Sequence, residues 1–177
     1  MGETSAMRIC FVCLGNICRS PAAEAITAHL LSQRDDLPEV EVTSAGTGPW
    51  HVGEPPHSHT RGEAARRGIP VNHLGYQFGT QDYERFDLIV AMDGGNMADL
   101  RDLAPEPDQS AKVVRLGAFA PGADERKWAG AAGADVPDPY GQPQHAFAAM
   151  FDQLEPACRG LLDWIADTGG DTEALGQ

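Results

Sequence analysis

The chain has 177 residues, 42% of them hydrophobic and 22% charged, which is the composition of an ordinary soluble globular protein of one domain. Its formal net charge of −13 argues against nucleic acid or an anionic membrane as a partner, and any phosphate site must be a local positive pocket. No apolar run is long enough to span a membrane and the amino terminus does not resemble a secretory signal, so a cytoplasmic location is predicted, with signal-independent export as the alternative.

The predicted elements alternate between short apolar strands and amphipathic helices. A buried strand at Arg8–Cys13 comes first, and a helix follows to about Arg34, with Ser20 as its N-cap and Pro21 as its first residue. The next elements in chain order are a strand at Glu39–Ala45, a helix at His59–Arg67 closed by Gly68, a strand at Phe86–Met92, a helix at Met97–Leu103, a strand at Lys112–Leu116 and a helix at Ala146–Ile165. Between the last two elements, Gly117–Pro143 is too long for a plain connection and is predicted to be a functional loop.

This order predicts an α/β fold in which helices cover both faces of a parallel sheet. We expect a single domain over residues 1–177, a four-stranded sheet in the order 2-1-3-4, and a flexible polar tail at residues 168–177. Functional sites in such sheets form beyond the carboxyl ends of the strands, which directs attention to Cys13 and Asp93. Asp93 can be part of a site or simply a turn residue.

The segment that begins with Cys13 combines features of a phosphate-binding nucleophile. Cys13 ends a buried strand, and Gly15 and Asn16 then permit the left-handed backbone of a turn whose N–H groups can converge on an anion. A helix amino terminus and Arg19 add positive potential, which would stabilise the thiolate of Cys13 and hold phosphate oxygens. The Ser20 hydroxyl can donate a hydrogen bond to that thiolate. The pattern therefore predicts covalent catalysis through a phosphocysteine.

Such chemistry also needs a proton donor for the leaving group, and Asp138 is the candidate. Asp138 stands between Pro137 and Pro139, which hold it in a rigid segment at the end of the long loop. The loop could swing this carboxylate over the pocket, and the same group would activate water in a second step. An aspartate before proline can also merely cap a turn.

The run Cys-Leu-Gly-Asn-Ile-Cys-Arg-Ser-Pro from residue 13, with Asp-Pro-Tyr from residue 138, resembles the low-molecular-weight protein tyrosine phosphatases of bacterial type. The resemblance covers about residues 8–166 and includes Thr43–Thr47 and the Trp50-His51 pair. It implies that Cys13 is the nucleophile, Arg19 the phosphate clamp and Asp138 the general acid and base. The other loop residues would bind the phosphate: Leu14, Gly15, Asn16, Ile17, Cys18 and Ser20.

The resemblance also implies roles for residues around the loop. Asn16 would be hydrogen-bonded to Ser20, Ser44 and His73. Cys18 would form a reversible protective disulfide with Cys13, although a passive role for Cys18 is equally open. Trp50 and Tyr140 would form the walls of a slot for a flat phosphotyrosine ring.

No metal or organic cofactor is implied. The expected partners are phosphotyrosine proteins and inorganic phosphate, as product and inhibitor, and the chain is expected to be a monomer. Gly141 stands where many members of the family have a second aromatic residue, and Leu74–Gln77 departs from the usual run after His73. These departures concern the choice of substrate and not the phosphocysteine chemistry.

Other functions are less consistent with the sequence. Arsenate reductases on this fold use a further cysteine pair in mid-chain, whereas residues 19–157 contain no cysteine. Protein-arginine phosphatases carry Thr where this chain has Ile17, whose bulk would favour a phenyl ring. A non-catalytic phosphotyrosine-binding module would be expected to lack Cys13, Arg19 or Asp138. Cys10 is predicted to be a core residue and Cys158 a core or surface residue, and strand alternation disfavours a zinc site built from Cys10, Cys13 and Cys18.

Overall fold

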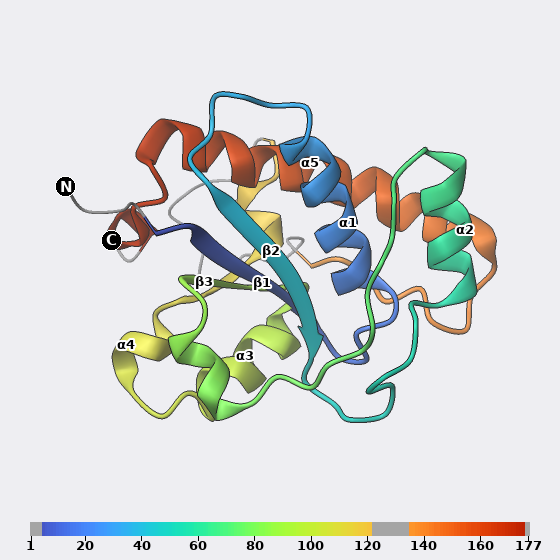
Figure 1. Ribbon diagram of the computed structural model, residues 1–177. Coiled ribbons are helices and arrows are strands. Elements are labelled where there is room, and N and C mark those ends of the chain that lie inside the picture. Colours follow the sequence, from blue (N-terminus) through green and yellow to red (C-terminus); the bar gives the residue numbers. More distant parts are fainter. Residues whose placement is uncertain (1–4, 122–134, 176–177) are drawn as a thin grey trace.

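The computed structural model describes residues 5–121 and 135–175, and confirms the four-stranded parallel sheet in the order β2-β1-β3-β4 (Figure 1). The strands are β1 (Met7–Cys13), β2 (Val40–Gly46), β3 (Leu88–Ala91) and β4 (Val113–Arg115). The α-helices are α1 (Arg19–Leu31), α2 (Ser58–Arg66), α3 (Gly94–Leu103), α4 (Pro107–Ser110) and α5 (Gln144–Thr168). Short 3-10 helices are η1 (Thr80–Glu84), η2 (Leu116–Phe119) and η4 (Thr172–Leu175).

The sheet is covered on both faces, so its central strands are apolar without alternation. Ile9 and Phe11 of β1 belong to one buried cluster together with side chains of α1 and α5. Cys10 and Val12 point to the other face, where they pack in a second cluster with η1 and α3. The strand order brings the carboxyl ends of β1 and β3 side by side, as a crevice-forming sheet requires.

Four helix starts differ from the sequence-based expectation, among them that of α5, which begins at Gln144 and not at Ala146. α1 begins at Arg19 and not after Ser20, because the Ser20 hydroxyl is engaged with Asn16 and Cys13 and does not cap the helix. α3 begins at Gly94, since Asp93 is its N-cap and accepts the Asn96 N–H at 2.7 Å. α2 begins at Ser58, with His57 in the capping position.

The carboxyl-terminal region also differs in its boundaries. α5 continues to Thr168, passes through Pro156, and ends at Gly169 in a left-handed conformation. The 3-10 helix η4 follows over Thr172–Leu175, within the segment predicted to be a flexible tail. Residues 122–134, about half of the predicted functional loop, lie outside the described residues.

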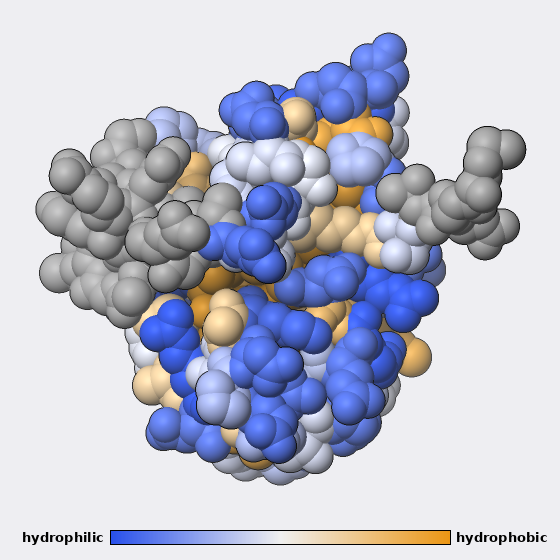
Figure 2. All heavy atoms as spheres, turned by 90° about the vertical axis from the view of Figure 1, so that its left-hand side faces the viewer, coloured by the Kyte–Doolittle hydropathy of each residue, from blue (hydrophilic) through white to orange (hydrophobic). Residues whose placement is uncertain are grey.

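Figure 2 shows the end of the molecule that carries both chain termini, opposite the carboxyl ends of the central strands. Hydrophilic side chains cover most of this face, with smaller hydrophobic areas between them. Within the part of the chain that the structure describes, no helix has the length and apolar character needed to cross a membrane.

Candidate active site

The loop between β1 and α1 surrounds the sulfur of Cys13, which ends its strand at the carboxyl edge of the sheet. Cys13 is 3% exposed. Its Sγ accepts the N–H of Asn16 at 3.3 Å and lies 3.0 Å from the Ser20 Oγ. The Ser20 Oγ accepts the Asn16 amide at 2.8 Å, and its own hydrogen has two acceptors in reach, the Ala45 carbonyl at 3.3 Å and Cys13 Sγ, so it can turn toward a thiolate at Cys13.

The loop is held from outside by its carbonyl groups. The carbonyls of Cys13, Leu14 and Ile17 accept N–H groups of Thr47, Gly48 and His57 at 2.9, 2.9 and 2.8 Å. In a trans peptide the C=O and the N–H point in opposite directions. The amides of the residues after these carbonyls therefore point to the inside of the loop, where they can bind an anion.

Asn16 fixes the shape of the loop from beneath. Its backbone adopts φ 57°, which asparagine tolerates better than most residues. Its side-chain amide donates to Ser20 and to Ser44 Oγ at 3.0 Å, as the family resemblance implied. Its Oδ1 lies 2.7 Å from His73 Nε2 and accepts the Tyr76 N–H at 3.0 Å.

Glu24 completes this network, and sequence reasoning missed it. Its Oε1 accepts the Ser44 hydroxyl at 2.8 Å and lies 3.2 Å from His73 Nδ1. The residue lies on the first helix with no distinguishing neighbour in the sequence, so no pattern could have identified it. Both ring nitrogens of His73 thus face oxygen atoms, which fixes the ring behind Asn16.

Arg19 is the buried cation of the site. It is 3% exposed, and its Nη1 donates to Asp93 Oδ2 at 2.6 Å and to the Val136 carbonyl at 2.9 Å. Burial by itself lowers the pKa of Arg19, but the hydrogen bond to Asp93 and the negative charges of Cys13 and Asp138 raise it above its ordinary value. The guanidinium is therefore anchored through one nitrogen and stays charged. The sequence did not decide whether Asp93 belongs to a site or to a turn. In the structure it positions Arg19 and also caps α3.

Asp138 lies in the same pocket, close to Arg19. Its Oδ2 is 3.8 Å from Arg19 Nη2, and its Oδ1 accepts the Tyr140 N–H at 3.1 Å. The segment before it is tied to the sheet, because the Val136 N–H donates to the Met92 carbonyl at 2.9 Å. The Asp138 carboxylate is half-exposed and faces the same space as Cys13.

These residues enclose a pocket of about 360 Å³. Its lining consists of Cys13, Leu14, Gly15, Ile17, Cys18, Arg19, Trp50, His51, Asp138 and Tyr140. Asn16 and Ser20 are not among these residues; they lie buried behind the loop. His51 is an addition to the predicted set, and its Nδ1 lies 2.6 Å from Glu54 Oε2.

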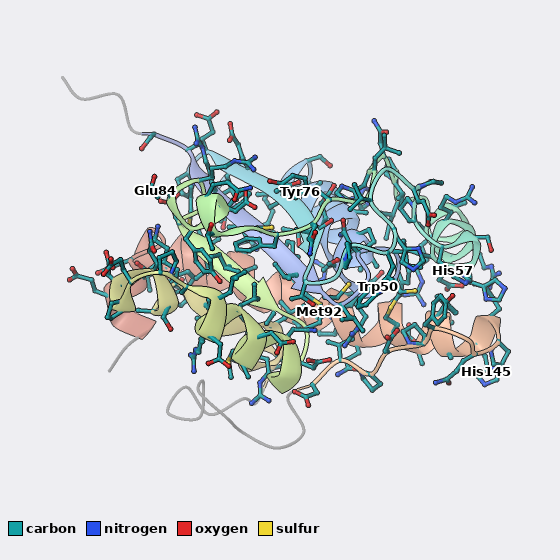
Figure 3. The ribbon with its side chains drawn as sticks, turned by 90° about the horizontal axis from the view of Figure 1, so that it is seen from below. Trp50, His57, Tyr76, Glu84, Met92 and His145 are labelled. Atoms are coloured by element: carbon teal, nitrogen blue, oxygen red, sulfur yellow. The ribbon has the colours of Figure 1, made fainter. Side chains whose placement is uncertain are left out.

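The two aromatic walls of the pocket differ from the loop in exposure. Trp50 is 65% exposed and Tyr140 59% exposed, so both rings present free faces to a ligand. In the view of Figure 3, Trp50 lies between Met92, which follows β3, and His57, which precedes α2. The pocket thus combines a polar, anion-binding base with an apolar mouth.

Cys18 lies in the same pocket as a neutral thiol. Burial, followed by the negative charges of Asp138 and Cys13, raises the pKa of Cys18 to about 12. The other two cysteines, Cys10 and Cys158, are fully buried in the core on either side of the sheet. Of the four sulfurs, only those of Cys13 and Cys18 belong to residues that line this pocket.

Comparisons of the sequence and of the fold with known proteins point to the same group of phosphatases. The family model described as low molecular weight phosphotyrosine protein phosphatase matches residues 8–170. The chain is 40% identical to a low molecular weight protein-tyrosine-phosphatase of Streptomyces coelicolor, over 88% of this chain and 91% of that protein. The crystal structure of YfkJ from Bacillus subtilis is similar with a TM-score of 0.81 and 36% identity, covering 94% of this chain and 98% of that chain. The Drosophila arginine phosphatase DARP is similar with a TM-score of 0.78 and 34% identity, covering 89% of this chain and 97% of that chain.

Proposed function

The chain belongs to the low-molecular-weight protein tyrosine phosphatase family, and from this premise we propose that it hydrolyses phosphotyrosine and other aryl phosphate monoesters through a phosphocysteine on Cys13. Arg19 binds the phosphate, and Asp138 is the general acid and base. The observation that carries the proposal is that Cys13, Arg19 and Asp138 line one pocket, built on a loop whose carbonyls at Cys13, Leu14 and Ile17 are hydrogen-bonded on its outer side.

In the first step, the Cys13 thiolate attacks phosphorus while Arg19 and the loop amides hold the non-bridging oxygens. The bond between phosphorus and the phenolic oxygen breaks, and protonated Asp138 donates its proton to that oxygen. The aryl ring of the substrate lies between Trp50 and Tyr140, whose exposed faces suit offset stacking.

In the second step, the Asp138 carboxylate removes a proton from water as the water oxygen attacks the phosphorus of the thiophosphate. The sulfur–phosphorus bond breaks, and Cys13 leaves as a thiolate that the Ser20 hydroxyl and the Asn16 N–H stabilise at 3.0 and 3.3 Å. Inorganic phosphate is released, and because it fits the same cradle it should inhibit competitively. No metal ion takes part in either step.

The test is phosphate release from a phosphotyrosine peptide at mildly acidic pH in the presence of a chelator. We expect turnover by the wild-type protein and by Cys158→Ala, which alters a cysteine outside the pocket. Cys13→Ser should bind the peptide without turning it over. If the wild type releases no phosphate from peptide or aryl phosphate, the proposal is wrong.

A second substrate class, phosphoarginine, is raised by the similarity to DARP. Ile17 lines the pocket of this chain, and its branched side chain narrows the space available to a guanidinium. We therefore expect phosphotyrosine to be the preferred substrate, and Ile17→Thr to raise phosphoarginine turnover relative to phosphotyrosine. Unchanged selectivity in that variant would show that Ile17 does not decide it.

We also propose that the protein acts in the cytoplasm and that its activity responds to thiol oxidation. All four cysteines are free, and Cys13 can act only as a free thiolate. Peroxide would convert the Cys13 thiolate to a sulfenic acid, and the sulfur of Cys18 would then displace water to form a disulfide. A dithiol reductant would return both cysteines to thiols.

A further inference from the structure

A second hollow lies on the other side of Trp50 from the candidate active site. Its volume is about 330 Å³. Its lining consists of Leu14, Thr47, Gly48, Trp50, Phe78, Asp99, Leu100 and Leu103. Leu14 and Trp50 belong to both hollows, so the two hollows adjoin at these two side chains.

The second hollow is apolar and open. Phe78 and Leu100 are buried and form its floor, whereas Leu14 and Leu103 are each 43% exposed. Of the seven large hydrophobic side chains that are exposed among the described residues, three line this one hollow. Exposed apolar side chains that gather in this way mark binding surfaces more often than isolated ones do.

The Trp50 ring, which both hollows share, packs against Gly48, a residue that lines the second hollow. A Cβ atom on Gly48 would lie 1.8 Å from the Trp50 ring, so the indole rests directly on the backbone of residue 48. The Gly48 N–H in turn donates to the Leu14 carbonyl of the phosphate loop. A ligand that bridges both sides of Trp50 would therefore contact a surface continuous with the catalytic loop.

We propose that this hollow binds a large apolar side chain of the substrate, one or two residues from the phosphotyrosine. The inference rests on the proposed phosphatase function and names its preferred substrate: a phosphotyrosine peptide with Leu, Met or Phe within two residues of the reacting residue. The occupant is a part of the substrate because the hollow is continuous with the pocket that holds the aryl ring.

The spacing of an extended peptide fits this arrangement. Side chains two residues apart lie on the same face of an extended chain, about 7 Å apart. An aromatic ring between two bound groups separates them by about the same distance, since carbon atoms in contact are about 3.5–4 Å apart. One side chain can therefore enter each hollow while the peptide passes over Trp50.

Asp99 gives the hollow a charge preference. It is the one charged residue in the described lining and is exposed on α3. A glutamate side chain at the same peptide position would meet this carboxylate and lose favourable contacts with the leucines, whereas a lysine could pack its stem and reach Asp99. The expected order of preference at this position is therefore leucine, then lysine, then glutamate.

The experiment compares kcat/KM for short phosphotyrosine peptides that differ at one position, from two residues before to two residues after the phosphotyrosine. Each position carries Leu, Lys, Glu or Gly in turn. We expect one position at which Leu is favoured over Gly about tenfold, the range of a well-placed apolar group in an open pocket. Leu103→Gln should reduce this preference to about threefold or less, and Asp99→Asn should reduce the penalty for Glu.

Two controls separate this inference from the proposed function. Leu74→Gln changes another exposed leucine, which lines neither hollow, so it should keep the wild-type preference. A small aryl phosphate cannot reach the second hollow, so its kcat/KM should be unchanged in Leu103→Gln, which also shows that the variant is folded. If the aryl phosphate is hydrolysed but no position prefers Leu, or if Leu103→Gln keeps the preference, the inference is wrong and the proposed function stands. If neither aryl phosphate nor peptide is hydrolysed, both fail.

Discussion

Gly46 is the point at which the second strand touches the phosphate loop, and the substitution Gly46→Ala tests how tightly that loop must be held. A Cβ atom at this position would lie 2.8 Å from the Leu14 carbonyl oxygen and 3.1 Å from Asn16 Cβ. Ordinary contacts of a Cβ begin at about 3.4 Å, so the loop would have to move by at least about 0.6 Å. The neighbours are backbone and a fully hydrogen-bonded side chain, so nothing flexible can yield instead.

The movement would act on catalysis more than on folding. Displacing the Leu14 carbonyl tilts the peptide whose N–H belongs to Gly15, one of the inward-pointing amides. Misplacement by about 1 Å can cost about 10²-fold in rate, so a shift of this size predicts a fall in kcat/KM of about ten- to 100-fold. Overpacking at a buried position would lower the free energy of unfolding by about 1–3 kcal/mol.

The assay measures kcat/KM for an aryl phosphate and the inhibition constant of inorganic phosphate, together with urea unfolding. Gly62→Ala is the matched control, because a Cβ there meets no atom within 4 Å on an exposed helix. That variant should be as active as the wild type and more stable by about 0.5–1 kcal/mol. If Gly46→Ala binds phosphate and turns over substrate within twofold of the wild type, the loop tolerates the displacement and the reasoning is refuted.

Three further predictions concern the catalytic groups. Asp138→Asn should lower kcat by about 10²–10⁴-fold for a phosphotyrosine peptide but much less for an aryl phosphate whose phenol is more acidic, because the better leaving group needs no proton; equal losses in steady-state assays would exclude Asp138 as the acid. Arg19→Lys should lower kcat/KM by about 10²–10³-fold, since an ammonium cannot bond to Asp93 and also grip phosphate with a planar fork; a loss under tenfold would contradict this. Excess peroxide should inactivate the protein, and a dithiol should restore activity in the wild type but not in Cys18→Ser, because without the disulfide peroxide oxidises the Cys13 sulfenic acid further to a sulfinic acid that a dithiol does not reduce; recovery of the variant would show that Cys18 does not protect Cys13.

Much of the fold was predictable because it follows from local patterns. The unbroken apolar run from Ile9 to Val12 predicted a strand buried on both faces, and the structure places its side chains in two separate clusters. The start of α1 was not predictable by capping rules alone. Ser20 looks like an N-cap, but its hydroxyl is engaged by Asn16 and Cys13, so the helix begins at Arg19, two residues before the predicted first residue Pro21, with no side-chain cap.

The site was predictable where its residues share one segment and unpredictable where they meet only in space. The residues from Cys13 to Ser20 are contiguous, so the sequence alone indicates a phosphate-binding nucleophile there, and Asp138 is recognisable because it lies between two prolines. Glu24 carries no such signal, since its role depends on which side chains the fold brings beside it. His51 belongs to the Trp50-His51 pair of the family resemblance, but its place in the pocket was not predicted. Asp93 was visible as a turn residue, but its ion pair with Arg19 spans 74 positions of the chain.

In the proposed mechanism Asp138 enters the reaction protonated, and the charges of the site agree with that assignment. The Arg19 cation faces Asp93 and Asp138 at 2.6 and 3.8 Å, and the Cys13 thiolate adds a further negative charge. A phosphate dianion that entered with Asp138 ionised would meet three anions and one cation in a partly buried space, where unpaired charge is costly. The inward amides and the amino terminus of α1 offset part of this repulsion but supply no full charge. A proton on Asp138 removes one of the three anions and is also the proton that the leaving phenolate needs, so substrate binding and acid catalysis select the same state of this carboxyl group.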